Sequence, residues 1–393
     1  MFAVGIIAEF DPLHNGHKYL LKRARELGGT HIAVVLSGSA VQRGEPAAFD
    51  KFSRAAAALE NGADLVIELP APYSCSNAEV FAGAGVSALA ALGRRAVSGL
   101  IFGCENDDTA LILRAADAAD ALKESSEVKD ALKSGLSYPA ALAFAAEERF
   151  GREIAEAFSQ PNSTLALEYC RAVRRIAPWI EPAAVKRIGA GHNASGIQDS
   201  IASGSEIRAL LRDGGDASGL MPPIGGERSD PQAVDKILLY RLMTARKRDL
   251  LALPDVDEAL ADRVLKTAAE PFDSSAGLLA ACKSRNITLA RLRRMALHLA
   301  LGVRAEDIAP LPFLRILAFN SRGRELLAAG EHILPADTSL VKLEKTSAQA
   351  QCVSRLERAA GALRALGTPS GIYENEYRRA VRMTEIQNSN KND

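Results

Sequence analysis

Short apolar runs alternate with helical patterns from the N-terminus to Ile188, and this alternation constrains the fold more than any other sequence feature. Uninterrupted apolar runs of this kind are typical of strands that helices cover on both faces. We therefore expect an α/β fold built on a doubly wound parallel sheet. Its strands are predicted at 2–8, 31–38, 63–70, 98–103 and 182–188, with helices at 17–27, 51–61, 78–92 and 161–173.

The pattern becomes wholly helical in two other parts of the chain. Residues 107–150 are predicted to form a helical insertion, and residues 233–393 an all-α C-terminal domain whose last residues fray. The stretch 216–232, which precedes that domain, is rich in glycine and proline and has the composition of a linker. We expect the first domain to span 1–215 and to include the insertion.

Charge and cysteine content exclude several classes of protein. The 48 basic and 48 acidic residues cancel, so any contact with nucleic acid must come from a local basic cluster, and DNA is not an expected partner. The five cysteines are scattered without zinc-ligand spacing, and no metal site is predicted. The N-terminus lacks a signal-peptide pattern, and no apolar stretch reaches the ~20 residues of a membrane span. These features are typical of a cytoplasmic protein without a membrane partner.

The first strand leads into a turn with two histidines, "EFDPLHNGH", which ends at His17. Backbone N–H groups at a strand-to-helix turn, together with the helix dipole, favour phosphate. His14 and His17 can donate hydrogen bonds to phosphate and stabilise the charge that grows on a leaving pyrophosphate, while Gly16 leaves room for a nucleotide. Such a short pattern also arises by chance on a protein surface, but its place between a strand and a helix favours the functional interpretation.

A second polar segment, "IASGSEIR", begins a late helix of the same domain. The hydroxyls of Ser203 and Ser205 and the guanidinium of Arg208 suit the β and γ phosphates of a nucleotide. The alternative is that a serine only caps the helix, which is its commoner role at such a position.

Both segments resemble signatures of the nucleotidylyltransferase superfamily, HxGH and ISSTxxR. Two positions depart from those signatures, since Glu9 stands where threonine is common and the second signature is shortened around Gly204. Further segments over residues 2–212 are similar, in the same order, to the tRNA(Met) cytidine acetate ligase family: "GIIAEFDPLHNGH", "LSGSAVQRGEPAAFDKFSRAAAAL", "GADLVIELP", "FGCE", "PNSTLALEY" and "VKRIGAGHN". The C-terminal half resembles that family more loosely, through "CKSRNITLARLRRMALHLAL" and "FLRILAFNSRG".

The resemblance implies a Rossmann-like nucleotidylyltransferase fold with ATP as co-substrate. Enzymes of this family convert acetate and ATP into acetyl-adenylate and pass the acetyl group to N4 of the wobble cytidine of elongator tRNA(Met). Mg2+ is expected to accompany ATP, although the sequence contains no dedicated metal cage. Two alternatives stay open: a nucleotidylyltransferase that acts on a small phosphorylated acceptor, and a non-catalytic nucleotide- or RNA-binding module.

The resemblance also implies the site residues. His14, His17 and Arg208 are the predicted catalytic residues. Gly103 is alternatively a strand-ending turn, Asn162 a helix cap and Arg187 a surface cation. The predicted ATP-binding residues are Ile7, Ala8, Glu9, Phe10, His14, Gly16, His17, Leu20, Gly103, Asn162, Arg187, Ser203, Ser205 and Arg208.

Two further charged stretches each allow two interpretations. The loop 42–55 either closes over the site or stays a solvated loop that caps a helix at Asp50. A basic stretch without acidic residues is predicted to follow an RNA backbone, with a solvated helix face as the alternative. Its members are Lys283, Arg285, Arg291, Arg293 and Arg294, and the segment 241–248 holds four more basic residues.

Overall fold

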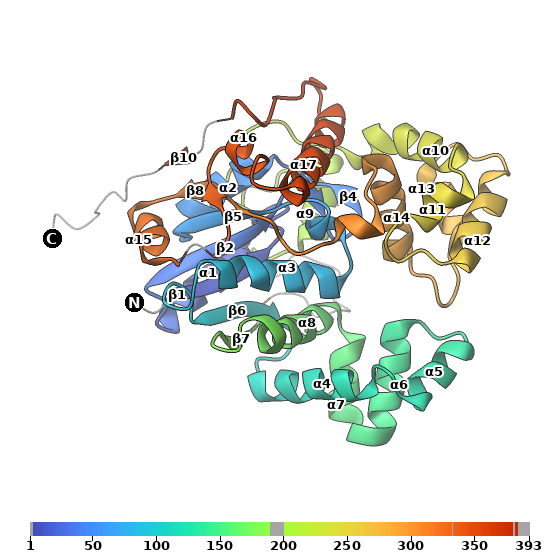
Figure 1. Ribbon diagram of the computed structural model, residues 1–393, viewed down its shortest axis with the longest axis horizontal. Helices are drawn as coiled ribbons and strands as arrows, with labels where there is room; N and C mark the ends of the chain where they lie inside the picture. Colours follow the sequence, from blue (N-terminus) through green and yellow to red (C-terminus); the bar gives the residue numbers. More distant parts are fainter. Residues whose placement is uncertain (1–2, 189–199, 332, 380–381, 384–393) are drawn as a thin grey trace.

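A central sheet of mostly parallel strands organises the molecule (Figure 1). The structure is a computed structural model, and it describes residues 3–188, 200–331, 333–379 and 382–383. In spatial order the strands are β10 (Arg382–Met383), β8 (Leu314–Phe319), β5 (Leu65–Leu69), β2 (His31–Ser37), β1 (Ala3–Ala8), β6 (Gly99–Cys104) and β7 (Glu181–Lys186), and β9 (Ala336–Asp337) also pairs with β8. The expected parallel α/β sheet is thus confirmed, while the predicted C-terminal tail and the end of "VKRIGAGHN" lie outside the described residues.

Alternation of side chains along β1 explains why helices cover both faces of the sheet. Ile6 packs with Val34 on the side of α1 (Asn15–Glu26) and α2 (Lys51–Glu60). Ile7 packs with Val35 on the opposite side. That side is covered by α3 (Ala78–Ala91), α8 (Pro161–Ile176) and α15 (Ser321–Ala329). Strands buried on both faces read as continuous apolar runs, which made them visible in the sequence.

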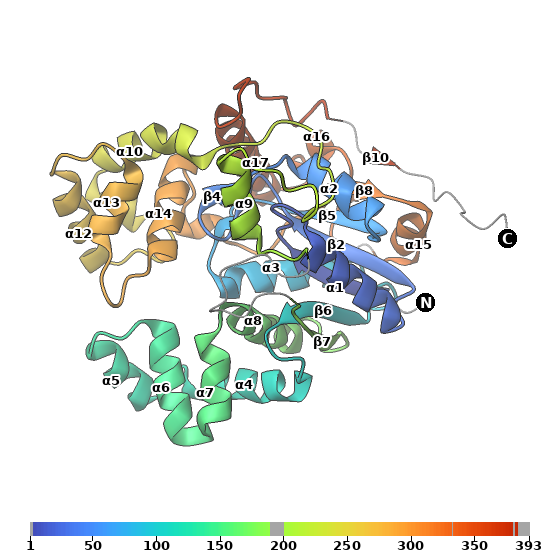
Figure 2. The same ribbon diagram turned by 180° about the vertical axis from the view of Figure 1, so that it is seen from behind.

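Two helical units stand at the end of the sheet opposite the N-terminus (Figures 1 and 2). The first unit contains the insertion predicted over 107–150 and continues through one more helix to Ser159. The second unit follows the glycine-rich stretch and has an apolar core of its own. The insertion consists of α4 (Thr109–Leu122), α5 (Ser126–Lys133), α6 (Tyr138–Phe150) and α7 (Arg152–Ser159). The second unit consists of α10 (Asp235–Met243), α11 (Lys247–Leu251), α12 (Glu258–Ala268), α13 (Ser275–Cys282) and α14 (Leu289–Leu301).

The C-terminal region differs from the all-α domain expected over 233–393. After α14 the chain returns to the sheet, where β8 pairs antiparallel with β5. The segment then continues through α15, α16 (Leu340–Leu343) and α17 (Ala348–Leu366). Arg315 interrupts the apolar run of β8 and hid the strand from a pattern-based reading, because a charged residue is rarely buried in a central strand.

The segment 216–232 also differs from a free linker. Ala217, Leu220 and Met221 are buried in a small cluster with Phe49. The backbone N–H of Asn15 donates to the carbonyl of Leu220 at 3.0 Å. Few residues of this stretch form helix or strand, yet it packs against the first turn of α1 and so supports it.

A buried charge cluster joins the returning C-terminal segment to the sheet. The Lys51 ammonium contacts carboxylates of Glu68, Glu357 and Glu376, and Arg315 pairs with Glu68 and Glu376. None of these five side chains is more than 3% exposed. Burial raises the pKa of Glu68 to about 7, so this carboxyl group is partly protonated at neutral pH.

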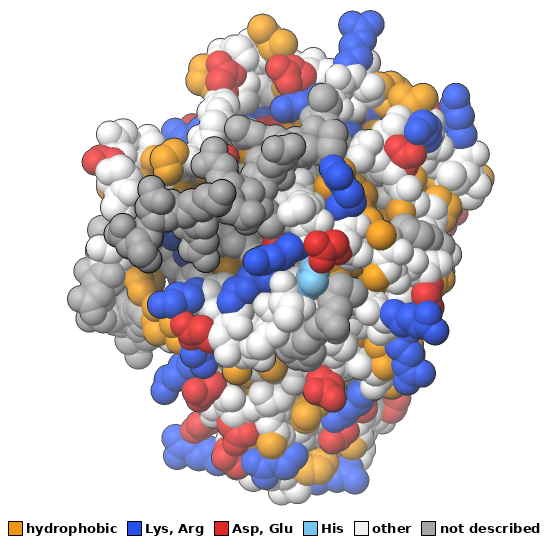
Figure 3. Space-filling model, turned by 90° about the vertical axis from the view of Figure 1, so that its left-hand side faces the viewer, with side chains coloured by type: hydrophobic (Ala, Val, Ile, Leu, Met, Phe, Trp, Pro, Cys, Tyr) orange, Lys and Arg blue, Asp and Glu red, His pale blue; other side chains and the backbone are white. Residues whose placement is uncertain are grey.

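Surface charge is mixed on the face that Figure 3 shows. There the Lys and Arg side chains of the described residues are interspersed with Asp and Glu side chains. None of the helices in the described part of the chain is long and apolar enough to cross a membrane.

We predict that Lys51→Met lowers the free energy of unfolding by at least about 3 kcal/mol, because Glu68 and Glu376 then share only Arg315 and Glu357 loses its cationic partner. Urea denaturation followed by circular dichroism measures the change. Lys342→Met is the matched control. The Lys342 side chain is 73% exposed and its ammonium pairs with Asp337, so loss of this pair should cost less than about 1 kcal/mol. Equal effects of the two substitutions would contradict the structural role of the cluster.

Candidate active site

A large cavity opens at the carboxyl ends of the parallel strands. Its volume is about 1140 Å3, and its walls come from the turn after β1, the ends of β6 and β7, the first turns of α8 and α9 (Gly204–Arg212), and α14. Ligands of doubly wound sheets bind at this edge, beside the strand where the chain order reverses. Here that strand is β1, which lies between β2 and β6.

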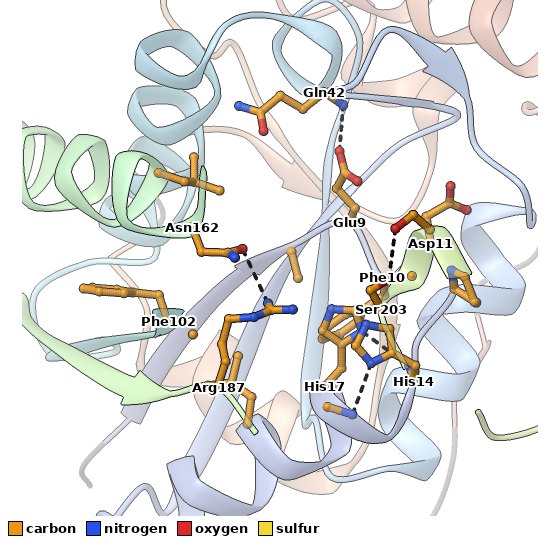
Figure 4. Close-up of a pocket in the computed structure, with 18 of the residues that line it drawn as sticks. Glu9, Phe10, Asp11, His14, His17, Gln42, Phe102, Asn162, Arg187 and Ser203 are labelled. Atoms are coloured by element: carbon orange, nitrogen blue, oxygen red, sulfur yellow. Dashed lines mark hydrogen bonds between the residues drawn. The ribbon is translucent and has the colours of Figure 1, made fainter. Parts of the chain in front are cut away.

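Two histidine rings cap the helix that leaves β1. His14 is the N-cap residue of α1, and its Nδ1 accepts the N–H of Gly16 at 3.1 Å. The Nδ1 of His17 accepts the N–H of His14 at 3.3 Å, so each ring satisfies a backbone donor near the helix start. The rings stack with centroids 3.8 Å apart and lie together on one side of the pocket (Figure 4).

This capping determines the chemistry of both rings. Burial, with Arg187 and Arg208 nearby, lowers the pKa of His14 to about 4. Burial and the neighbouring His14 lower the pKa of His17 well below its usual range. Both rings are therefore neutral, and since Nδ1 is an acceptor the proton lies on Nε2. The pair supplies uncharged N–H donors to the cavity.

Gly16 packs against the capping ring of His14, and its role of leaving room for a nucleotide stays a prediction. A Cβ there would lie 2.9 Å from the His14 ring, closer than side-chain carbons pack. Gly16 therefore leaves room for the capping ring. Phe10 adds a constraint at the same turn: its φ is +44°, which bulky residues rarely adopt, and its ring packs 4.8 Å from that of His17.

The second predicted segment faces the histidines across the turn. Ser203 caps α9 by accepting the N–H of Glu206, so its capping role is present, and its hydroxyl lies 2.9 Å from that of Ser205. Arg208 donates to the carbonyl of Asp11 at 2.6 Å. A Cβ on Gly204 would lie 3.1 Å from the Arg208 guanidinium, so the shortened signature lets that arginine approach the turn.

The start of α8 forms the opposite wall. Glu105, which sequence reasoning did not single out, accepts hydrogen bonds from the backbone N–H groups and side chains of Asn162 and Ser163. These bonds lower the pKa of Glu105 against the opposing effect of burial. Arg187 donates to the Asn162 side-chain oxygen at 3.4 Å, and both line the cavity (Figure 4). A carboxylate two residues after Gly103, at the end of a strand, was the available sequence signal.

The loop 42–55 is tied down by ion pairs. Arg43 pairs with Glu9, Asp11 and Glu45, and Glu9 also accepts the N–H of Gln42 at 2.7 Å. Burial raises the pKa of Asp11, but the charge of Arg43 outweighs it and the net shift is downward.

The other two basic residues of this loop point away from the cavity. Arg54 is fully buried and donates to backbone carbonyls, including that of Ser37 at 2.9 Å. Lys51 belongs to the buried charge cluster. Neither cation is available to neutralise a ligand. Asp50 caps α2, as the alternative interpretation of this loop predicted.

An apolar wall completes the cavity and was not predicted. Phe81, Phe102 and Tyr169 are buried there, and Leu165 lies beside them. Apolar residues on α3, β6 and α8 look like ordinary core positions in a sequence, because nothing local distinguishes a cavity wall from a packed interior.

The structure brings all fourteen predicted ATP-binding residues to this one cavity. The predicted RNA-binding residues do not stay together. Arg294 lines the cavity, Arg291 donates to the carbonyl of Asp255, and Arg293 pairs with Glu45 at 3.4 Å. Lys283 and Arg285 are exposed before α14.

The carboxylates of the cavity do not form a cation cage. Glu9 and Asp11 are engaged by Arg43, and Glu105 is engaged by the start of α8. Among the residues that the structure describes, no group of three or more His, Cys, Asp or Glu side chains is placed to hold a metal ion. The donor set therefore does not fit a resident metal.

Comparison with known proteins shows the family to which the chain is similar. A profile of the HIGH Nucleotidyl Transferase family matches residues 1–375. The tRNA(Met) cytidine acetate ligase of Syntrophotalea carbinolica is 36% identical over 364 residues, which cover 87% of this chain and 86% of that relative. The ligase of the same name from Bacillus velezensis is 33% identical over 362 residues, covering 86% of each chain.

Solved structures of Thermotoga maritima TmcAL are similar in fold. The apo form superposes with a TM-score of 0.88 at 26% identity. The form bound with alpha-thio ATP superposes with a TM-score of 0.84 at 25% identity. Both comparisons cover 98% of this chain and 100% of the Thermotoga chain.

We predict that acid destabilises the protein through the two capping histidines. In the unfolded chain their pKa is near 6.5, whereas folding lowers the pKa of His14 to about 4 and that of His17 well below 6.5. Stability is thus lost as pH falls below 6.5, by about 2 kcal/mol for His14 alone at pH 5. Urea unfolding at pH 7 and pH 5 measures the loss. The double variant His14→Asn/His17→Gln keeps capping side chains but does not titrate there, and an equal loss in it would refute this origin.

Proposed function

The chain belongs to the HIGH nucleotidyl transferase family and, within it, to the tRNA(Met) cytidine acetate ligases, and on that premise we propose its reaction and the residues that perform it. The enzyme is an ATP-dependent ligase of the cytoplasm. It activates acetate as acetyl-adenylate and transfers the acetyl group to N4 of the wobble cytidine of elongator tRNA(Met), giving N4-acetylcytidine.

One observation carries this proposal: a single cavity collects phosphate-binding groups of several kinds. His14 and His17 provide neutral N–H donors, and the first turn of α9 lines the same space, whereas the first N–H groups of α1 already bond to acceptors of the protein. Arg187 and Arg208 line it, and no carboxylate of the described residues pairs with either guanidinium. Such a set suits a triphosphate.

In the first step a carboxylate oxygen of acetate attacks the α-phosphorus of ATP, and the bond to the bridging oxygen of the β-phosphate breaks. Pyrophosphate leaves toward His14, His17 and Arg208, which stabilise the charge it gains. Ser203 and Ser205 add donors on that side. The adenosine lies toward Gly103, with the apolar wall beneath the base and Asn162 and Arg187 along the ribose and α-phosphate.

In the second step the cytidine N4 attacks the acetyl carbonyl carbon and AMP leaves. No covalent enzyme intermediate is needed, so the protein acts by positioning and by electrostatic stabilisation. We propose that Mg2+ arrives with ATP, held by phosphate oxygens and water, because the described carboxylates are already engaged.

We predict that isotope-labelled acetate and ATP label unmodified tRNA(Met), with AMP and pyrophosphate appearing in step with the label. An analogue of ATP with a non-hydrolysable α,β link should block labelling, because the bond that breaks lies there. A tRNA(Met) without the wobble cytidine should accept no label. Labelling from acetyl coenzyme A without ATP, or release of ADP, would overturn the proposal. Adenylyl transfer to a small phosphorylated molecule would favour the alternative enzyme.

Histidine variants that preserve the helix cap test whether His14 and His17 take part in the first step. His14→Asn keeps an N-cap acceptor for the N–H of Gly16, and His17→Gln keeps an acceptor for the N–H of His14. Each removes one Nε2–H donor, so acetate-dependent ATP–pyrophosphate exchange should fall at least about tenfold. Native exchange in both variants would remove the histidines from the mechanism.

We propose that tRNA contacts the second helical unit near the cavity. Lys283 and Arg285 are exposed before the start of α14, and Arg293 is exposed on that helix, where it pairs with Glu45. Other side chains of α14 reach the cavity. The segment 241–248 is a weaker candidate, because Arg246 pairs with Asp249 and Lys247 with acidic residues of α12.

Replacement of Lys283, Arg285 and Arg293 by alanine should weaken tRNA binding and reduce its salt dependence by about two phosphate contacts. Filter binding over a range of salt concentrations measures both. The variant Arg246→Ala/Lys247→Ala/Arg248→Ala loses the same formal charge from paired side chains and should have a smaller effect. If both triple variants weaken tRNA binding equally, the surface near α14 is not a specific contact site for tRNA.

A further inference from the structure

The cavity is lined by more residues than the predicted ATP site uses. Its volume is about 1140 Å3, at the upper end of the 300–1,000 Å3 or so that is usual for ligand pockets. The predicted nucleotide-binding groups occupy the side of the histidines, α8 and α9. The remaining side is lined by Glu9, Gln42, Arg43, Ala290 and Arg294. This second half, which we name the acceptor side, comes from the end of β1, the hairpin of β3 (Ala40–Val41) and β4 (Glu45–Pro46), and α14.

Glu9 is an unexpected residue in a pocket for a triphosphate, because a carboxylate repels phosphate. Four carboxylates line the cavity, and the other three are committed to the protein. The Asp11 side chain is 0% exposed and pairs with Arg43. Glu105 accepts four hydrogen bonds at the start of α8, and Glu206 completes the cap of α9. The Glu9 side chain is 28% exposed and accepts two hydrogen bonds, so its carboxylate can accept further hydrogen bonds from a ligand.

Two anchors hold the Glu9 carboxylate in place. One oxygen accepts the N–H of Gln42 at 2.7 Å, and the other accepts from Arg43 at 3.1 Å. Figure 4 shows Glu9 and Gln42 across the pocket from the two histidines. A fixed carboxylate opposite the phosphate-binding groups is suited to a ligand that carries N–H donors.

Arg294 supplies the opposite charge on the acceptor side. It is half-buried on α14, and the turn at Gly44 packs against its backbone, since a Cβ on Gly44 would lie 2.4 Å from the Arg294 nitrogen. No hydrogen bond or ion pair joins its guanidinium to any residue that the structure describes. A guanidinium without a carboxylate partner in a cavity wall is suited to an anionic ligand.

A cytidine within an RNA strand offers a group that suits the Glu9 carboxylate and a group that suits the Arg294 guanidinium. Its N4 amine is a hydrogen-bond donor that carboxylates accept, and its flanking phosphates are anionic. Uridine carries an acceptor at the corresponding atom, which a carboxylate repels.

We infer that the acceptor side is the subsite for the target cytidine, in which Glu9 binds the N4 amine and takes its proton while Arg294 pairs with a flanking phosphate. As N4 forms its bond to the acetyl carbon, the carbon–oxygen bond to AMP breaks with its electron pair going to AMP. The N4 proton passes to the Glu9 carboxylate and then to water. This inference rests on the proposed function and assigns Glu9 to the acceptor in place of ATP.

The test separates the two steps of the reaction in the full-length enzyme. Hydroxylamine traps acetyl-adenylate as acetohydroxamate without tRNA, whereas single-turnover labelling of tRNA(Met) reports transfer. Glu9→Gln keeps an oxygen for the N–H of Gln42 but cannot take a proton. We expect its transfer rate to fall about 100-fold, with hydroxamate formation changed by less than about threefold.

Matched variants distinguish recognition from a disturbed loop. Glu45→Gln alters another partner of Arg43 without lining the cavity, and both activities should stay within about twofold of native. Glu9→Asp retains a carboxylate and should recover part of the transfer rate even if the glutamine variant folds poorly. Arg294→Gln should slow transfer and spare hydroxamate formation, and Arg294→Lys should restore part of the loss.

Each outcome decides the inference. Native transfer in Glu9→Gln, or equal losses of hydroxamate and transfer, would overturn the role of Glu9 and leave the proposed function intact. Absence of hydroxamate with the native enzyme, acetate and ATP would instead overturn the proposed function. Slower transfer with retained hydroxamate in Glu9→Gln, partly recovered by Glu9→Asp, is the result that supports the subsite.

Discussion

The unsatisfied N–H groups at the start of α1 are the constraint on which the site depends. Every helix begins with backbone donors that lack intrahelical partners. Here the acceptors are the Nδ1 atoms of His14 and His17, so capping and ligand chemistry share the same two rings. Because one nitrogen of each ring is used for capping, the other is a defined donor. The cap thus converts a requirement of folding into an ordered, uncharged surface, which we propose binds phosphate.

Buried charge networks hold the turns around that cap. Arg43 joins the end of β1 to the hairpin through Glu9 and Asp11, and Lys51 joins α2 to the returning C-terminal segment through Glu357. Such groups are costly to bury alone, so each depends on partners from another part of the chain. The networks therefore fix the relative positions of segments more than they add to stability. These pairs also tie down the loop 42–55, which was predicted either to close over the site or to stay solvated.

The architecture brings two kinds of chemistry to one edge of the sheet. The α/β core contributes neutral donors and arginines near the switch point of the sheet, and α14 brings Arg294 to the same cavity. The second helical unit has its own apolar core, so it can present an exposed basic surface while one helix reaches inward. Activation and acceptor recognition can therefore use adjoining halves of a single pocket.

The sequence by itself determined those parts that local patterns encode. Continuous apolar runs identified five strands of the sheet, and the turn from strand to helix identified His14 and His17, because strand burial and turn chemistry act over a few neighbouring residues. The tertiary structure alone decided what depends on residues far apart in the chain. It placed β8 in the sheet despite its buried Arg315, gave Glu105 its role at a distant helix start and turned Arg294 toward the cavity, since charge pairing and cavity walls arise only when remote segments meet.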